Sequence, residues 1–138
     1  MRDLPPTAAE RFRTLRTTLL ELEGVTERIK FIRPNWKWTW EYALPNRKLC
    51  WLHMMETGIG GTFTLSLDDE REIAGVKLAS VIAEAIRSGQ RTGPVLWSWV
   101  EFSDRKSIDA FLAFMKRKAT WVAAAPQDSR IFRRSKAG

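Results

Sequence analysis

Three stretches of the chain carry apolar residues at the spacing of an α-helix, and polar residues between them. They cover residues 7–24, residues 68–88 and a segment that begins at Ser103 or Asp104. Each has a polar residue suited to cap its start. The inward positions recur every three or four residues, which predicts one buried face per helix: Ala8, Phe12, Leu15, Leu19 and Leu22; Ile73, Val76, Leu78, Ile82 and Ile86; Ile108, Phe111, Leu112 and Met115.

Four other stretches have the pattern of β-strands. Residues 36–43, 62–67 and 95–102 alternate apolar and polar side chains, whereas residues 48–56 are apolar on both faces, as in a central strand. Residues 25–33 are ambiguous, and we interpret them as a turn leading into an extended segment. The predicted element order is αβββαβα. This order predicts an α+β domain with a four-stranded, mostly antiparallel sheet and helices over one face.

Composition is that of one folded domain. Of 138 residues, 44% are hydrophobic and 28% are charged, and no apolar run approaches the roughly 20 residues that cross a bilayer. The N-terminal residues lack the apolar region of a secretory signal. The single cysteine, Cys50, excludes an internal disulfide framework. We therefore expect a cytoplasmic protein with no membrane partner, built as one domain over residues 1–122.

The net charge of +7 is concentrated near the C-terminus. Residues 1–115 carry a net charge of only +1, whereas residues 116–138 carry +6. We expect residues 123–138 to be a basic, flexible tail. This segment is the alternative candidate for binding nucleic acid, through seven cations: Lys116, Arg117, Lys118, Arg130, Arg133, Arg134 and Lys136.

The segment PNWKWTWEY places an aromatic ring at every second position of a predicted strand. Trp36, Trp38, Trp40 and Tyr42 then share one face, and the opposite face is expected to contact water. Trp51, His53 and Met55 would form a second row on the next strand, with Trp97 and Trp99 as a third. We expect Trp38 and Trp40 to pack beneath the helices and Trp36 to border an opening.

Seven tryptophans exceed what core filling requires, because each buried indole N–H needs a hydrogen-bond partner. We therefore predict a groove that the helices close only in part. It would suit a flat, apolar or cationic small molecule, with Glu41, Glu56 or Glu101 at its rim. The candidate ligand-binding residues are Trp36, Trp38, Trp40, Tyr42, Trp51, His53, Trp97, Trp99, Glu41 and Glu101.

No catalytic or metal-binding motif stands out. Cys50 and His53 are each the only residue of their type, but side chains three apart on a regular strand point to opposite faces. We expect a buried thiol and a partly exposed histidine rather than a dyad, and one cysteine with one histidine is too few for zinc. Residues 58–61, GIGG, lack the Lys-Ser/Thr of a phosphate loop and are interpreted as a hairpin connection.

These features resemble an uncharacterised bacterial family, domain of unknown function 3788. The resemblance covers roughly residues 36–118: an aromatic strand, Leu49-Cys50, residues 60–67, residues 93–101 and an acid-capped helix. It implies a fold but no activity. A more distant similarity is to YdhG-like and YjbR-like small α+β domains, and some YdhG-like proteins are described as iron chaperones. The acidic ridge that this implies is not present here, because the acids are interleaved with lysine and arginine.

The leading hypothesis is a non-enzymatic domain that binds a small apolar or aromatic ligand, or a protein partner, through a Trp-rich sheet face. Nucleic-acid binding through the basic C-terminal segment, with stacking on the sheet, is the alternative. An enzyme that uses Cys50 or His53 ranks third. The sequence indicates no cofactor, and it leaves the oligomeric state open, a homodimer included.

Overall fold

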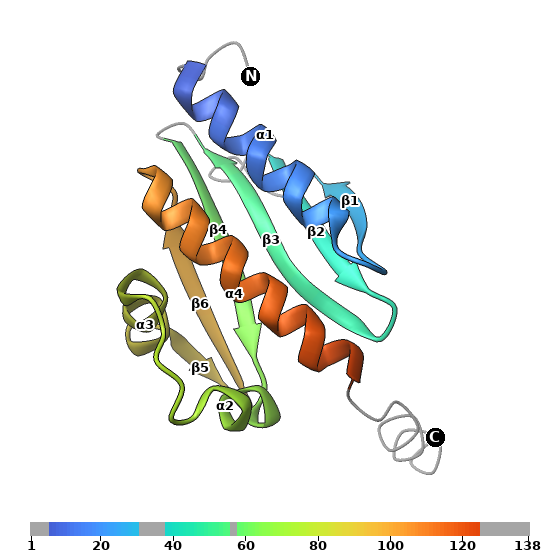
Figure 1. The fold of residues 1–138 in the computed structure, drawn as a ribbon, viewed down its shortest axis with the longest axis vertical. Coiled ribbons are helices and arrows are strands. Elements are labelled where there is room, and N and C mark those ends of the chain that lie inside the picture. Colours follow the sequence, from blue (N-terminus) through green and yellow to red (C-terminus); the bar gives the residue numbers. More distant parts are fainter. Residues whose placement is uncertain (1–5, 31–37, 56–57, 125–138) are drawn as a thin grey trace.

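A computed structural model of the chain describes residues 6–30, 38–55 and 58–124 and shows an α+β fold with an antiparallel sheet (Figure 1). The sheet has six strands in the order β1-β2-β3-β4-β6-β5. Consecutive strands pair as neighbours along most of this order, as expected for strands joined by short turns. The strands are β1 (Thr26–Lys30), β2 (Trp38–Leu44), β3 (Arg47–Met55), β4 (Gly58–Leu65), β5 (Gln90–Thr92) and β6 (Val95–Glu101).

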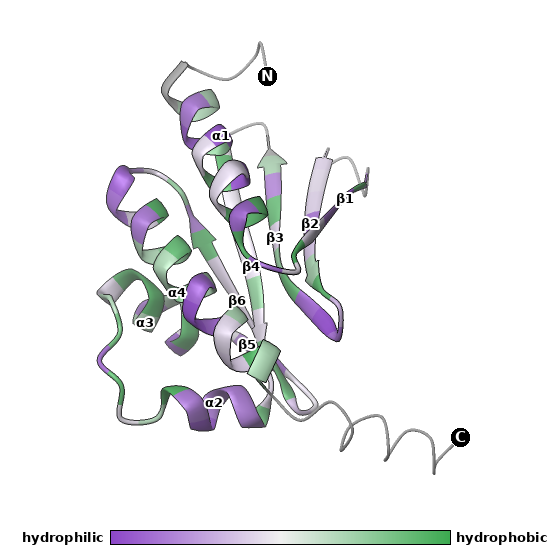
Figure 2. Cartoon of the chain, turned by 45° about the vertical axis from the view of Figure 1, so that its right-hand side comes forward, coloured by the Kyte–Doolittle hydropathy of each residue, from purple (hydrophilic) through white to green (hydrophobic). Residues whose placement is uncertain are grey.

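The helices lie over one face of this sheet. The long helices α1 (Pro6–Glu21) and α4 (Arg105–Ala124) cross it side by side, and α3 (Ser80–Arg87) lies against β6. The short α2 (Leu67–Ile73) follows β4 and is mostly hydrophilic (Figure 2). No described helix covers the opposite face of the sheet, which we call the open face. None of the described helices is long and apolar enough to cross a bilayer.

The strand register assigns side chains to the two faces. Tyr42 lies opposite Cys50, and Cys50 lies opposite Phe63; all three are fully buried under the helices. Three positions along, Thr39 is paired with His53, and that row lies on the open face. The core therefore fills the space between the sheet and α1, α3 and α4.

The predicted fold class is confirmed, but the predicted four strands and the element order are wrong. The order is αββββααββα. β1 was ambiguous because its sequence TERIK is mostly polar, and β5 has only three residues. The predicted helix over 68–88 is two helices separated at Gly75, whose φ of +78° suits glycine.

The GIGG segment is part of a strand, not only a connection. Gly58 has a positive φ of +151°, as the hairpin interpretation requires, but Gly60 and Gly61 lie within β4. A Cβ on Gly60 would meet the Trp99 ring at 2.5 Å, and one on Gly61 would meet the Phe102 ring at 2.7 Å. These two glycines therefore leave room for aromatic rings on opposite faces of the strand.

The helix α4 extends to Ala124, two residues beyond the predicted domain limit. The predicted tail from residue 125 onward, with its cations from Arg130, lies outside the described residues. The same holds for Trp36 and Glu56. The predictions for these residues stay predictions.

Candidate functional site

The predicted aromatic residues do not form one surface. Trp38, Trp40 and Tyr42 face the helices, because Trp40 pairs with the buried Leu52. Trp51 and His53 alternate with Leu52 on β3 and so point to the open face. Trp97 and Trp99 share that face, together with Glu41 and Glu101. The prediction of three rows on one face is wrong because adjacent strands pair with an offset that alternation within one strand does not reveal.

Burial decreases along β2 toward its start. Tyr42 is fully buried, Trp40 is half-buried, and Trp38 is 45% exposed. The Trp40 ring packs edge to face against Phe12 of α1. The prediction that Trp38 packs beneath the helices is therefore wrong, since α1 covers Trp40 but leaves much of Trp38 accessible.

A groove follows this exposed end of the strand, between α1 and the outer strands. It has a volume of about 600 Å³, within the range of small-molecule sites. Ile29 is 50% exposed on its β1 wall, opposite α1. We call this site the α1 groove; it is lined by Phe12, Arg13, Arg16, Ile29, Trp38, Trp40 and Met54.

Arg16, which lines the α1 groove, forms an ion pair with Glu27. Arg16 donates to both carboxylate oxygens of Glu27, at 2.7 and 2.9 Å, and the hydroxyl of Tyr42 donates to the same carboxylate at 2.7 Å. The hydrogen bonds from Arg16, and then that from Tyr42, lower the pKa of Glu27 against the effect of burial. The sequence hypothesis did not include Arg16 or Glu27, which lie on separate elements.

The open face carries a second aromatic cluster. The ring of Trp51 packs against the ring of Trp97, and the ring of His53 stacks on that of Trp99. In each contact the ring centroids are 5.5 Å apart. Trp97 is 42% exposed and Trp99 is 37% exposed. This cluster therefore presents ring surface to solvent.

Polar residues on the open face are buried around this cluster. His53 lies between two hydroxyls, with Nδ1 3.1 Å from Thr39 Oγ1 and Nε2 2.9 Å from Thr62 Oγ1. Burial lowers the pKa of His53 to about 4, so the ring is neutral at pH 7. The prediction of a partly exposed histidine is wrong, because only 2% of His53 is exposed.

The polar side of β2 does not contact water as expected. Thr39 is fully buried, and Glu41 is 4% exposed between two lysines. Lys30 Nζ lies 2.8 Å from Glu41 Oε1, and Lys48 Nζ lies 3.3 Å from Oε2. Burial raises the pKa of Glu41, but these two ammonium groups outweigh it and the pKa lies below its ordinary value. Glu41 is thus a structural ion-pair centre, not the rim of the α1 groove.

Cys50 and His53 cannot act together. They lie on opposite faces of β3, and burial raises the pKa of the Cys50 thiol to about 12. The predicted buried thiol is confirmed. A thiol with this pKa gives almost no thiolate near neutral pH, and the thiolate is the nucleophile. Among the described residues, no group of three or more His, Cys, Asp or Glu is placed to hold a metal ion.

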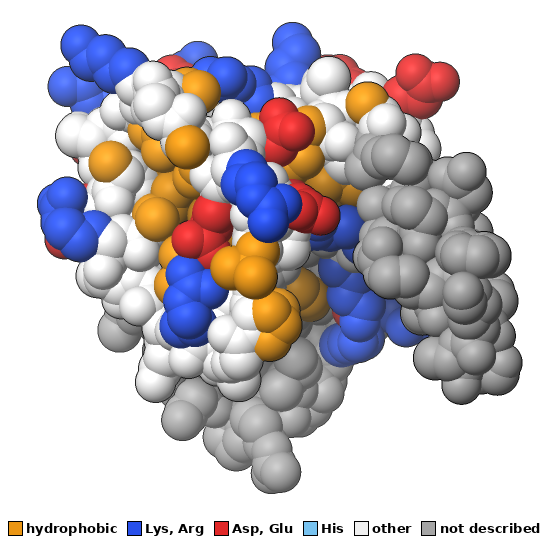
Figure 3. Space-filling model, turned by 90° about the horizontal axis from the view of Figure 1, so that it is seen from below, with side chains coloured by type: hydrophobic (Ala, Val, Ile, Leu, Met, Phe, Trp, Pro, Cys, Tyr) orange, Lys and Arg blue, Asp and Glu red, His pale blue; other side chains and the backbone are white. Residues whose placement is uncertain are grey.

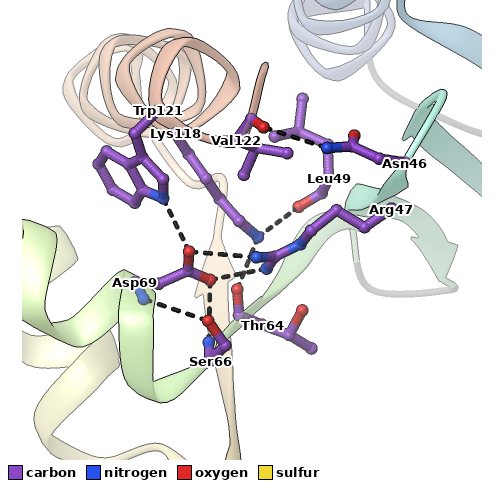
Figure 4. A network of polar contacts seen from close by, with 9 residues as sticks. All are labelled: Asn46, Arg47, Leu49, Thr64, Ser66, Asp69, Lys118, Trp121 and Val122. Atoms are coloured by element: carbon purple, nitrogen blue, oxygen red, sulfur yellow. Dashed lines mark hydrogen bonds and ion pairs between the residues drawn. The ribbon is translucent and has the colours of Figure 1, made fainter. Parts of the chain in front are cut away.

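A buried polar network joins α4 to the ends of three other elements (Figure 4). Asp69 accepts two hydrogen bonds from Arg47, at 3.1 and 2.6 Å, and one from Trp121 Nε1 at 2.7 Å. Lys118 Nζ donates to Leu49 O at 2.9 Å and to Thr64 O at 2.6 Å. Lys118 was predicted as a nucleic-acid contact, and this is wrong because its side chain is fully buried.

Charge on the described body is mixed. A larger hollow, of about 820 Å³, lies between α1 and the start of α4, and both acidic and basic side chains line it, including Glu10, Arg11 and Asp104. Viewed from below, cations and carboxylates are interspersed with apolar side chains rather than separated by sign (Figure 3). The charge that would attract a polyanion is thus not concentrated on that surface.

Comparison with known proteins found no matching family model, no matching curated protein and no matching solved structure. The resemblance to domain of unknown function 3788 therefore stays a prediction.

Proposed function

We propose that this protein is a non-enzymatic binding domain and that the α1 groove is its ligand site. The observation that carries the proposal is the exposed apolar wall of the groove: Trp38 is 45% and Ile29 50% exposed beside a hollow of about 600 Å³. Concave sites lined by aromatic and aliphatic side chains are the usual places for small ligands. The ligand class is a small molecule with a flat or elongated apolar body.

The structure of the groove also suits binding without catalysis. Its lining holds no histidine, cysteine or carboxylate among the described residues, and these are the groups most often used for proton transfer or nucleophilic attack. The half-buried Trp40 is fixed against Phe12, so part of the site is rigid before a ligand arrives. Rigid walls reduce the entropy lost on binding.

Titration with the neutral dye N-phenyl-1-naphthylamine tests the proposal, because the dye fluoresces strongly once it leaves water. We expect saturable binding to the wild type and a loss of about tenfold or more in affinity for Trp38→Ala and Ile29→Asp. Trp97→Ala removes a similarly exposed tryptophan from the open face and serves as the matched control. Loss of dye binding in Trp97→Ala alone would refute the α1 groove as the site.

A second candidate function, binding of single-stranded nucleic acid, is supported by the aromatic cluster on the open face. Bases stack on exposed tryptophan rings, and Trp97 and Trp99 offer two of them. The nearby Lys30 and Lys48 are already paired with Glu41, which weakens their attraction for phosphate. Fluorescence anisotropy of a labelled oligothymidylate distinguishes the two possible binding sites. Binding by stacking on the open face is lost in Trp97→Ala, whereas binding by the tail is lost on truncation after Ala124.

A further inference from the structure

The α1 groove has charge of one sign. Of the described side chains that line it, Arg13 and Arg16 are basic and none is acidic. The two glutamates that the sequence suggested for its rim and that the structure describes, Glu41 and Glu101, lie on the open face instead. A cationic ligand, which the sequence hypothesis allowed, would therefore meet like charge here.

The two arginines differ in their partners. Arg16 is held by both oxygens of Glu27, so that its charge is compensated within the fold. Arg13 forms no ion pair with any residue in the described parts of the chain, and it is exposed. The net charge of the groove is therefore carried by Arg13.

The geometry of α1 and β1 places Arg13 beside the exposed apolar wall. β1 runs back along α1 after the turn at Gly24, so positions earlier in α1 match positions later in β1. Arg13 precedes Arg16 by three residues, about 4.5 Å along the helix axis, and Ile29 follows Glu27 by two residues, about 6.6 Å along the strand. Because Arg16 contacts Glu27, Arg13 lies near the level of Ile29, and both line the groove.

We infer that the ligand of the α1 groove carries an acidic group, which the guanidinium of Arg13 binds while the apolar body lies across Trp38 and Ile29. This inference rests on the proposed function of the groove. The planar fork of a guanidinium matches a carboxylate or sulfonate. Arg16 and Glu27 already form such a pair one turn along the same helix.

A matched pair of dyes tests this inference. The sulfonate dye 8-anilinonaphthalene-1-sulfonate shares its anilinonaphthalene body with neutral N-phenyl-1-naphthylamine but adds an acidic group. We expect the wild type to bind the sulfonate dye about fivefold more tightly than the neutral one, a difference of about 1 kcal/mol. We expect Arg13→Ala to abolish this preference while it changes the affinity for the neutral dye by less than about twofold. Arg13→Lys should retain part of the preference, because the charge remains without the fork.

Control variants separate this effect from general surface charge. Arg105→Ala removes an exposed arginine of α4 that lies outside the α1 groove, and it should leave both affinities unchanged. Raising the salt concentration to 1 M should reduce the preference of the wild type, since the screening length then falls to about 3 Å.

The outcomes distinguish the two proposals. Equal affinity of the wild type for both dyes, or an equal loss of both dyes in Arg13→Ala, would overturn the acidic-group inference and leave the binding function intact. Failure of the wild type to bind either dye would overturn the binding function and, with it, this inference.

Discussion

The ring of Trp40 meets the ring of Phe12 edge to face, with centroids 4.6 Å apart and ring planes inclined by 68°. This contact joins α1 to β2 at the inner end of the α1 groove. Phe12 is 5% exposed, so the pair belongs to the core as well as to the groove. Two positions earlier on β2, Trp38 is 45% exposed, and the two tryptophans should differ in what they contribute to stability.

Replacement of Trp40 by alanine should lower the free energy of unfolding by about 2–4 kcal/mol, somewhat below the penalty for a fully buried tryptophan. The loss reflects the cavity left beside Phe12. Trp38→Ala should cost less than about 1 kcal/mol, because this side chain is 45% exposed. Urea denaturation of the two variants measures both values. Equal losses would show that Trp38 is as well packed in solution as Trp40.

Alternation along the chain predicted which residues share a strand face and, for β2, which face the helices cover, but not how the strands align. Trp40 and Tyr42 were placed correctly toward the helices, whereas Trp51 was placed on the wrong face. Register depends on pairing between strands that are distant in sequence. The same limit explains β1, whose five residues form a strand by pairing with β2.

Two buried polar residues, Asp69 and Lys118, had signals in the sequence. Ser66 and Asp69 have the spacing of a capping box, and the structure shows both of its hydrogen bonds. Lys118 lies three residues after Met115 and four before Val122, which is the spacing of one helix face. Its charge suggested solvent exposure, and we predicted it as a nucleic-acid contact, although its position on the helix is that of a buried residue. What the sequence did not contain was the identity of their partners on other elements.

Asp69→Asn should destabilise the protein by about 3 kcal/mol, because it leaves Arg47 without its counter-ion in a largely buried position. Asp69 is 1% exposed and accepts hydrogen bonds from Arg47, from Trp121 and from the Ser66 backbone. Asp68→Asn is the matched control: this neighbour is exposed and forms an ion pair with Arg71. It should change stability by less than about 0.5 kcal/mol. Guanidinium denaturation at pH 7 compares the two.

His53 should make the fold sensitive to mild acid. Its pKa of about 4 in the folded state lies below the ordinary 6.5, so between these values the unfolded state binds more protons than the native state. Stability is therefore fully present above pH 6.5 and falls as the pH is lowered toward 4. The loss at pH 5 should be roughly 2 kcal/mol.

His53→Gln removes this titration and keeps an amide near Thr39 and Thr62. Its stability should change little between pH 6.5 and pH 5, while that of the wild type declines. Thermal melts at several pH values in this range test the difference. Parallel curves for the two proteins would show that His53 is not the group responsible.

Lys118 closes the sheet where β3 and β4 separate. The last paired residues there are Cys50 and Phe63, and Lys118 Nζ binds the carbonyls of the next residue on each strand, Leu49 and Thr64. The ammonium thus donates to one carbonyl of each strand just beyond their last paired residues. Lys118→Met removes this donor from both carbonyls and should cost about 2–4 kcal/mol at pH 7.

The pH dependence shows whether the side chain of Lys118 titrates in the folded protein. Burial lowers the pKa of Lys118 to about 8 from its ordinary 10.5, so between these values the unfolded state again binds more protons, and wild-type stability rises with pH. The gain from pH 7 to pH 8.5 should be roughly 0.5–1 kcal/mol. Lys118→Met should lack it, so its deficit relative to the wild type grows over this range. Lys116→Met, an exposed site on the same helix, should retain the wild-type slope. If Lys118→Met retains that slope as well, Lys118 does not titrate in this range and its charge is not penalised by burial.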